Sequence, residues 1–242
     1  MSEQVADRLE AATGTGARFL EIGVGTGRIA LPLYARGRRI AGIDLSIPML
    51  ERYRAKAVSA GLAPPPVMRA DATRLPLRDA SVDAVIEVHV LHLIPDWPRA
   101  LAEVRRVLAP GGVVLAARRR WERSEGHGPR ARARERHAAI LAELGVRSEH
   151  VGARSDEEVL GALTDLGGRV EVLDPVSWRD HETWAEYLGI LERRVWSESW
   201  RVPEAVWRKG LRRLRAELDA EGVDLHAPVA TTRYFEIAAI RF

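Results

Sequence analysis

The sequence predicts an α/β fold in which a doubly wound, mostly parallel sheet of seven strands is covered by helices on both faces. Short apolar runs bounded by turn residues alternate with longer segments of helical periodicity between residues 18 and 117. This alternation is typical of parallel strands joined by crossover helices. Hydrophobic residues make up 46% of the 242-residue chain, which is enough to bury one core. We therefore expect a single domain over residues 1–242, with insertions.

The first part of the chain predicts five strands, each an apolar run that ends at a turn residue or an acid. These strands are expected at residues 18–20, 38–44, 67–70, 82–88 and 113–117. Helices are expected before and between them, at residues 2–12, 28–34, 46–61 and 97–108. The third of these helices begins at Ser46, a preferred N-cap residue, and has Pro48 in its first turn, where proline is favoured.

The regular alternation stops after the fifth strand, and two helical insertions are expected, one after strand five and one between strands six and seven. They comprise residues 118–150, which are rich in arginine, and residues 178–221, which are rich in tryptophan. Ser155 and Glu158 have the spacing of a capping box. The remaining elements are a helix and two strands, at residues 155–166, 169–173 and 232–240.

The composition excludes several classes of site and of protein. The chain has no cysteine, which excludes disulfides, thiolate metal sites and a cysteine nucleophile. It has no apolar leader segment and no run of about 18 apolar residues, so we expect a cytoplasmic protein without a membrane span. It also has no Asn and one Gln, a depletion of thermolabile side chains that favours a thermophilic source. The chain also has far more arginine than lysine, which either a thermophilic source or the base composition of the genome explains equally well.

The most informative segment is the glycine-rich turn after the first strand, which runs from Glu21 to Arg28. Such a turn lets backbone amides approach a ligand closely, because no Cβ intervenes. The dinucleotide fingerprint G-x-G-x-x-G requires a small residue at the place of its third glycine, and this place is occupied by Arg28 here. Glu21 would repel a pyrophosphate but suits a ligand that carries an ammonium group. The turn therefore disfavours a nicotinamide or flavin cofactor.

Acidic residues stand at the ends of the next three predicted strands. Asp44 ends the second strand, Asp71 follows the third, and Glu87 lies at the end of the fourth, before His89. Ligands of open parallel sheets bind outside the carboxyl ends of the strands. Asp44 could accept hydrogen bonds from ribose hydroxyls and Asp71 from an adenine amino group. Either acid alone could be a helix-terminal or solvated loop residue, but together they predict a nucleoside site.

The run E-x-G-x-G-T-G-R, from Glu21 to Arg28, resembles motif I of the class I S-adenosylmethionine-dependent methyltransferases. Three later segments resemble the same family, at residues 70–85, 90–97 and 108–112. The resemblance extends over residues 18–117, which form the expected cofactor-binding core. It is closest to the small-molecule branch, of methyltransferase type 11. It implies a Rossmann-like fold, S-adenosyl-L-methionine as cofactor and methyl transfer to a small molecule.

The same resemblance implies which residues bind the cofactor. Its methionine end is expected at Glu21, Gly23, Gly25 and Gly27. Its ribose and adenine are expected at Asp44, Leu45, Met49, Asp71 and Ala72. Val88 is expected near the sulfonium.

Methyl transfer from a sulfonium requires in-line approach and exclusion of water, and it requires a base only when the nucleophile must lose a proton. His89 is the best-placed candidate for that base, although a histidine at a strand end is also a common packing residue. No catalytic residue is assigned, and His89 and Trp184 are candidate acceptor-site residues. No metal is expected, since the catechol-type enzymes use an Asn ligand that this chain lacks. Residues 87–90 also differ from the N-P-P-Y motif of DNA amino-methylating enzymes.

The two insertions are candidates for a cap over the acceptor site. Many members of the family that the chain resembles have a lid helix before the first strand, and only 17 residues precede that strand here. Residues 178–221 contain five of the seven Trp. Five apolar residues share one helical face there, which packs on the core or forms a wall over the acceptor: Trp184, Tyr187, Leu188, Leu191 and Val195. The arginines of residues 118–136 form a solvated face, or they bind an anionic acceptor or RNA.

Two alternative functions follow from these open points. The chain could be an RNA or protein methyltransferase that uses its arginine-rich insertion. It could also be a non-catalytic module that binds S-adenosylmethionine. The formal net charge of only +3 gives little support to nucleic acid binding, and the sequence does not indicate the oligomeric state.

Overall fold

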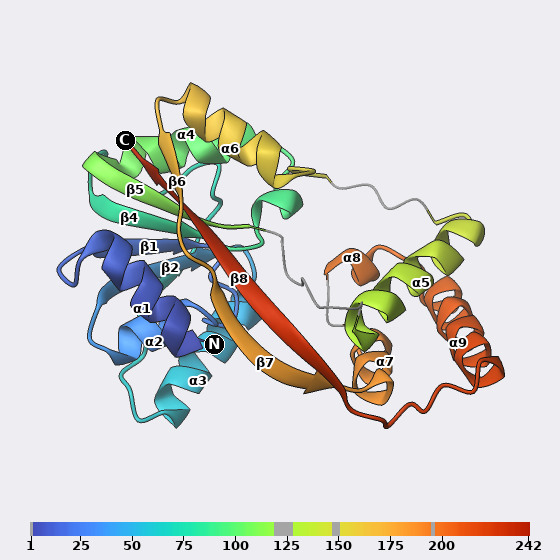
Figure 1. The fold of residues 1–242 in the computed structure, drawn as a ribbon. Helices are drawn as coiled ribbons and strands as arrows, with labels where there is room; N and C mark the ends of the chain where they lie inside the picture. The colour runs from blue at the N-terminus through green and yellow to red at the C-terminus, as the bar shows by residue number, and fades with distance from the viewer. Residues whose placement is uncertain (1, 119–127, 147–150, 195–196) are drawn as a thin grey trace. The chain divides into compact units, whose positions relative to one another are not determined.

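The structure, a computed structural model, describes residues 2–118, 128–146, 151–194 and 197–242 (Figure 1). Contacts between residues divide the chain into two compact units. The first, which we call the sheet unit, comprises residues 1–120, 150–176 and 235–242. The second, the helical unit, comprises residues 121–149 and 177–234. Most of both expected insertions therefore belongs to the helical unit.

The sheet unit is built on one mixed sheet with the strand order β3-β2-β1-β4-β5-β8-β6. Its strands are β1 (Arg18–Ile22), β2 (Arg39–Asp44), β3 (Val67–Arg69), β4 (Val82–Glu87), β5 (Leu108–Arg118), β6 (Arg169–Val172) and β8 (Val229–Arg241). Strands β1 to β5 pair in parallel, whereas β8 is antiparallel to both β5 and β6. The predicted doubly wound, mostly parallel sheet is confirmed.

One further strand, β7 (Val176–Glu182), pairs with β8. The helical insertion predicted from Trp178 onward is therefore wrong for residues 178–182. Both ends of β7 are buried, and exposed and partly buried residues alternate between them. Trp178, for example, is partly buried, and its two neighbours are exposed. This period of two is the pattern of a strand that is covered on one side.

Helices cover both faces of the sheet, as expected. They are α1 (Ser2–Thr13), α2 (Ala30–Ala35), α3 (Ile47–Ser59), α4 (Trp97–Val107), α6 (Asp156–Asp165) and the 3₁₀ turn η1 (Leu91–Leu93). Figure 1 shows α1, α2 and α3 on one face and α4 beside α6 on the other. Ala84, Val85 and Ile86 of the central strand β4 are consecutive and all fully buried, which follows from this double cover.

Two helix starts show how well local signals define the elements. Helix α3 begins after Ser46 as predicted, although the Ser46 side chain makes no capping bond. Helix α6 begins after Ser155, whose Oγ accepts a hydrogen bond from the Glu158 N–H at 3.2 Å. The Glu158 carboxylate accepts one from the Arg154 N–H at 2.8 Å, one residue before the partner that a capping box would use.

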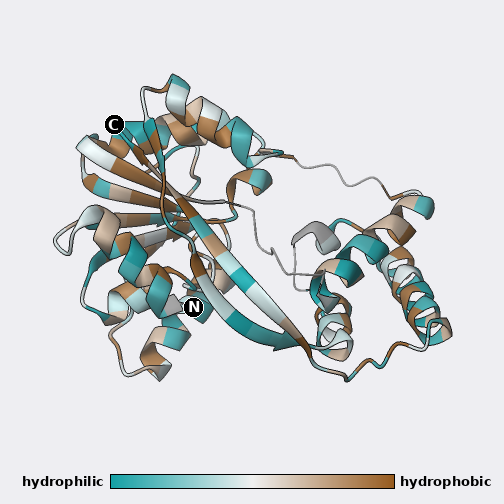
Figure 2. Cartoon of the chain, viewed as in Figure 1, coloured by the Kyte–Doolittle hydropathy of each residue, from teal (hydrophilic) through white to brown (hydrophobic). Residues whose placement is uncertain are grey.

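The helical unit contains α5 (Pro129–Glu143), α7 (Trp184–Glu192), α8 (Ser197–Trp200) and α9 (Glu204–Ala220). Helix α5 packs on α7 and on α9, and apolar residues line their shared core (Figure 2). Trp184, Tyr187, Leu188 and Leu191 are all buried in that core. The apolar face predicted for this helix therefore packs inside the unit, while Val195 lies outside the described residues.

Candidate functional site

The glycine turn follows β1, and all three of its glycines have positive φ: 66° at Gly23, 54° at Gly25 and 75° at Gly27. Only glycine adopts this conformation without strain. A Cβ on Gly23 would lie 2.4 Å from a Val90 methyl carbon, and one on Gly27 would lie 2.2 Å from the Tyr53 ring. A Cβ on Gly25 would meet only the Gly23 carbonyl oxygen, at 3.9 Å. The turn is therefore open to a ligand at Gly25 and closed by packing on either side.

Glu21 is the last but one residue of β1 and is only 3% exposed. Burial raises the pKa of its carboxyl group to about 8, and the nearby charge of Asp44 raises it further. The positive charge of Arg28 and a hydrogen bond from the Ala30 backbone act in the opposite direction. Its Oε2 has no hydrogen-bond partner among the described residues. A buried carboxylate oxygen without a partner costs free energy, which a cationic ligand group would recover.

Asp44 ends β2 beside this turn. Its Oδ2 accepts a hydrogen bond from the Gly25 N–H at 2.9 Å, and its Oδ1 accepts one from the Ser46 N–H at 2.8 Å. The carboxylate therefore ties the glycine turn to the start of α3. Its ribose contact stays a prediction, which these bonds allow because each carboxylate oxygen has a further lone pair. The adjacent Leu45 side chain is 60% exposed and that of Met49 is half-buried, so apolar surface is available there.

Asp71 and Ala72 follow β3. The Oδ1 of the exposed Asp71 accepts hydrogen bonds from both the backbone N–H and the hydroxyl of Thr73, at 2.9 Å each. Ala72 is buried in the core. Asp71 thus shapes its own turn, and its contact with an adenine stays a prediction.

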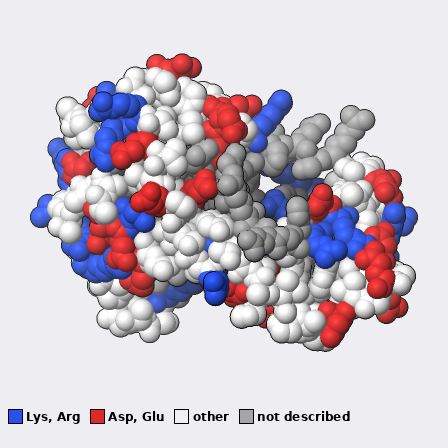
Figure 3. Space-filling model, viewed as in Figure 1, with Lys and Arg blue, Asp and Glu red and all other residues white. Residues whose placement is uncertain are grey.

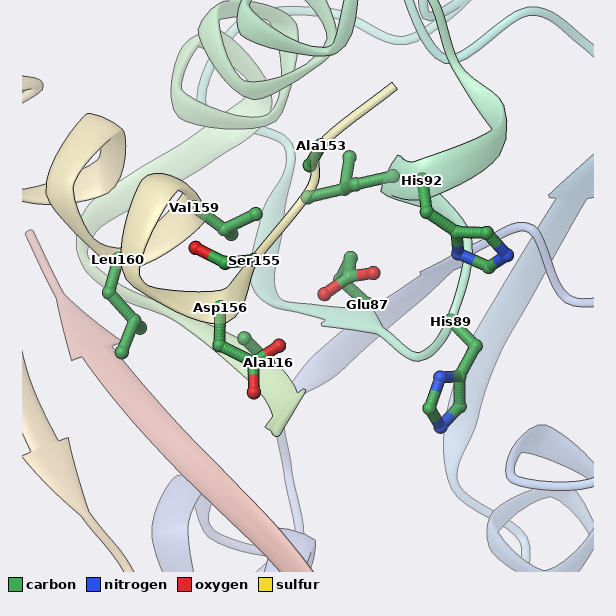
Figure 4. Close-up of a pocket in the computed structure, with 10 residues that line it drawn as sticks. Glu87, His89, His92, Ala116, Ala153, Ser155, Asp156, Val159 and Leu160 are labelled. Carbon is green, nitrogen blue, oxygen red and sulfur yellow. The ribbon is translucent and has the colours of Figure 1, made fainter. Parts of the chain in front are cut away.

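A pocket lies at the carboxyl ends of β4 and β5. Its volume of about 30 Å³ has room for about one water molecule. Figure 4 shows Glu87 near its centre, with His89 and His92 on one side and Ser155 and Asp156 from the start of α6 on the other. Backbone hydrogen bonds from Gly152 and Ala153 to the carbonyls of His92 and Leu91 hold the two sides together. Ser155 and Asp156 were not predicted as residues of this pocket. The capping signal predicts where the helix begins, but it does not show which other residues lie close to that helix start.

His89 stands in this pocket with a φ of 55°, a conformation that is unfavourable for residues other than glycine. The turn that holds it is closed by the Val90 N–H, which donates to the Glu87 Oε1 at 3.3 Å. Glu87 is 7% exposed. Strained residues of this kind are common at functional sites. The predicted role of His89 is therefore compatible with where the structure places it.

Two predicted site residues are not among the residues that line this pocket. Val88 lines a different, small apolar cavity, with Ile29, Leu115 and Phe235 among its other walls. Trp184 is 5% exposed inside the core of the helical unit, and the Arg132 guanidinium lies 5.9 Å from its ring centre. Their contacts with cofactor and acceptor stay predictions, as does the capping role of residues 178–221.

The arginine-rich insertion is described only from residue 128 onward, so Trp121 and the arginines at 119 and 120 lie outside the described residues. On α5, Arg136 forms ion pairs with Glu217 of α9 and with Glu221, the C-cap residue of that helix. Acidic and basic side chains are interspersed on the surface of this unit (Figure 3). These pairs favour a structural role for Arg136.

The described part of the chain lacks two features, a membrane-spanning helix and a cluster of metal ligands. None of its helices is both long and apolar enough to cross a membrane. None of its His, Asp and Glu residues form a group of three that could hold a metal ion.

Residues 20–116 match the family model described as a methyltransferase domain. The chain is 40% identical over 101 residues to phosphatidylethanolamine N-methyltransferase from Cereibacter sphaeroides, a match covering 41% of this chain and 49% of that protein. It is 41% identical over 100 residues to demethylmenaquinone methyltransferase from Thermus thermophilus, covering 40% of this chain and 45% of that protein. The chain thus spans about half the length of these curated relatives.

Solved structures show the same fold over nearly the whole chain. The YcgJ protein from Bacillus subtilis superposes with a TM-score of 0.62 at 17% identity, over 98% of this chain and 97% of that one. At this identity the likeness concerns the fold alone.

Proposed function

We propose that this chain, which belongs to the class I S-adenosylmethionine-dependent methyltransferases, transfers the methyl group of S-adenosylmethionine to a small-molecule acceptor. The family is the one predicted from the motifs, and the match of residues 20–116 to a methyltransferase domain supports it. One observation carries the proposal for this chain. The Glu21 carboxylate is buried beside the glycine turn, and its Oε2 has no partner among the described residues.

The residues of the turn fit the methionine end of this cofactor, which carries an ammonium group and no phosphate. Glu21 would bind that ammonium group, because a buried carboxylate is stabilised by a cation in hydrogen-bond contact. Gly25 would leave the approach open, since no side chain stands there. Asp44 holds the turn in place through the Gly25 N–H and would offer its remaining lone pairs to the ribose.

When bound, the cofactor supplies a methyl group that its positive sulfonium already activates, so the protein has to orient the reactants and exclude water. The pocket around Glu87 and His89 has room for about one water molecule. We assign to His89 the acceptance of a proton from acceptors whose nucleophile carries one. An acceptor whose nucleophile carries no proton would not need this step.

The acceptor is proposed to be a small molecule because the matched relatives are named for such acceptors, phosphatidylethanolamine in one and demethylmenaquinone in the other. The paired state of Arg136 gives no support to RNA as the acceptor.

The first experiment is calorimetry of the full chain with S-adenosylmethionine, S-adenosylhomocysteine and NAD. We expect both sulfur ligands to bind and NAD to bind more weakly or not at all. A panel of small amines, phenols and quinols is then tested for acceptor-dependent release of S-adenosylhomocysteine. Binding without release across the panel would favour a non-catalytic module, and release with tRNA or protein alone would favour the other alternative.

A further inference from the structure

The helical unit contains a hollow that the proposed function does not use. It lies between the C-terminal end of α7 and residues 204–215 of α9 and has a volume of about 340 Å³, within the usual range for small-molecule sites. Two buried apolar side chains line it, those of Trp207 and Leu211, which are 5% and 7% exposed. The hollow therefore offers apolar surface as well as space.

Its polar lining is dominated by guanidinium groups, from Arg194, Arg208, Arg212 and Arg215. Two of these arginines are neutralised by lining glutamates, Arg208 by Glu204 and Arg215 by Glu192. Neither Arg194 nor Arg212 forms an ion pair with a carboxylate in the described part of the chain. The described lining thus has two positive charges in excess.

Arg194, which lines this hollow, has an unusual backbone conformation. Its φ is 51°, at the position after α7 where helices commonly end with glycine. The guanidinium donates to the carbonyls of Ser199 and Val202, and it lies 5.7 Å from the Trp207 ring centre. These contacts offset the strain of the left-handed backbone. Arg194 is therefore preorganised, and its buried Nε has no hydrogen-bond partner among the described residues.

We propose that this hollow binds a phosphate monoester with an apolar or planar body. A phosphate monoester carries close to two negative charges near neutral pH, which matches the two arginines without a carboxylate partner. Guanidinium forks match the geometry of phosphate oxygens, and Trp207 and Leu211 would contact the apolar body. The glutamates at the rim, Glu192 and Glu204, disfavour the continuous phosphate backbone of a nucleic acid.

The test uses calorimetry of the full chain with phenyl phosphate, with benzoate, inorganic phosphate and phenol as comparison ligands. Arg212→Gln is the test variant. Arg213→Gln is its matched control, because Arg213 is the next residue of the same helix, does not line the hollow and pairs with Glu143 and Glu217.

We expect phenyl phosphate to bind more tightly than each comparison ligand. Arg212→Gln should weaken its binding roughly tenfold, as expected for losing a hydrogen bond to a charged group, and Arg213→Gln by less than about twofold. Equal effects of the two variants, no binding of phenyl phosphate, or tighter binding of benzoate or inorganic phosphate would overturn the proposal. A short RNA oligonucleotide that binds more tightly than phenyl phosphate, and is weakened equally by both variants, would replace it with a nucleic acid surface. None of these results depends on cofactor binding or methyl transfer.

Discussion

Two buried glutamates, Glu21 in the sheet unit and Glu182 in the helical unit, differ in how far the fold satisfies their carboxyl groups. In the sheet unit, the buried carboxylate of Glu21 keeps an oxygen without a partner among the described residues. In the helical unit, the buried carboxylate of Glu182 pairs with Arg233 and also accepts a hydrogen bond from the Arg130 N–H at 3.2 Å. A buried carboxyl group that the fold satisfies is structural, whereas one that it leaves unsatisfied points to a ligand.

The largest effect should come from removing a core side chain of the helical unit. Trp207 is buried, donates through its indole N–H to the Leu191 carbonyl at 2.9 Å and contacts the edge of His137. We expect Trp207→Ala to lower the free energy of unfolding by about 3–5 kcal/mol. Chemical denaturation measures this loss, and calorimetry should find the affinity for S-adenosylhomocysteine unchanged at a temperature where the variant is folded.

A matched variant in the sheet unit sharpens this first prediction. Leu101→Ala removes a fully buried side chain of α4 and should cost about 2–5 kcal/mol. If Trp207→Ala weakened cofactor binding, the two units would not be separable in function.

Asp44 tests the sheet unit at the proposed ribose contact. Asp44→Ala should weaken cofactor binding by about 1.5–3 kcal/mol, the usual cost of losing hydrogen bonds to a charged group. It also leaves the N–H groups of Gly25 and Ser46 without their acceptor, so the glycine turn should loosen while the fold survives. Asp79→Ala is the control, because its exposed side chain pairs with Arg106 and it is not among the predicted cofactor-binding residues. Unchanged affinity in Asp44→Ala, measured by calorimetry, would show that the ribose is held elsewhere.

The ionisation of Glu21 should lower the stability of the free protein as the pH rises. Its pKa in the folded protein, about 8, lies above its ordinary value of 4.5. The folded state therefore holds the proton more tightly, and its stability falls as the pH rises from about 4.5 towards 8. Glu21→Gln cannot ionise, so the free variant should have a higher Tm than the wild type at pH 8 and a flatter Tm profile. A thermal shift series from pH 5 to pH 8 checks this prediction.

The smallest effect should come from the paired arginines of the helical unit. Arg136→Gln removes ion pairs with Glu217 and Glu221 and should cost about 0.2–1 kcal/mol of stability, reduced by added salt. Binding of tRNA should not change. A loss of tRNA affinity in this variant would reopen the nucleic acid hypothesis for the insertion.

The two units also differ in how far the sequence predicts them. In the sheet unit, strand ends and glycines are local signals, so the turn at Glu21 and the acid at Asp44 could be located from the chain alone. The strand β7 could not, because its aromatic and charged residues also fit a helix and only pairing with β8 decides between the two. The approach of Asp156 to Glu87 depends on tertiary packing, which no local pattern encodes.

The same limit applies to the helical face of Trp184. The sequence shows that its apolar residues share a face, but both a core and an acceptor wall require such a face. The structure buries Trp184 inside the helical unit, between helices that are distant in the sequence. Which partner a face contacts is a property of the fold.

The most direct test of the account is the number of protons released when S-adenosylhomocysteine binds. Calorimetry at pH 6.5 in two buffers of different ionisation enthalpy measures this number. In the free protein Glu21 holds its proton at this pH, because its pKa is about 8, and an ammonium group in contact with the carboxylate would displace it. The account predicts release of roughly one proton by the wild type and of none by Glu21→Gln. Equal proton release by both proteins, with equal affinity, would contradict it.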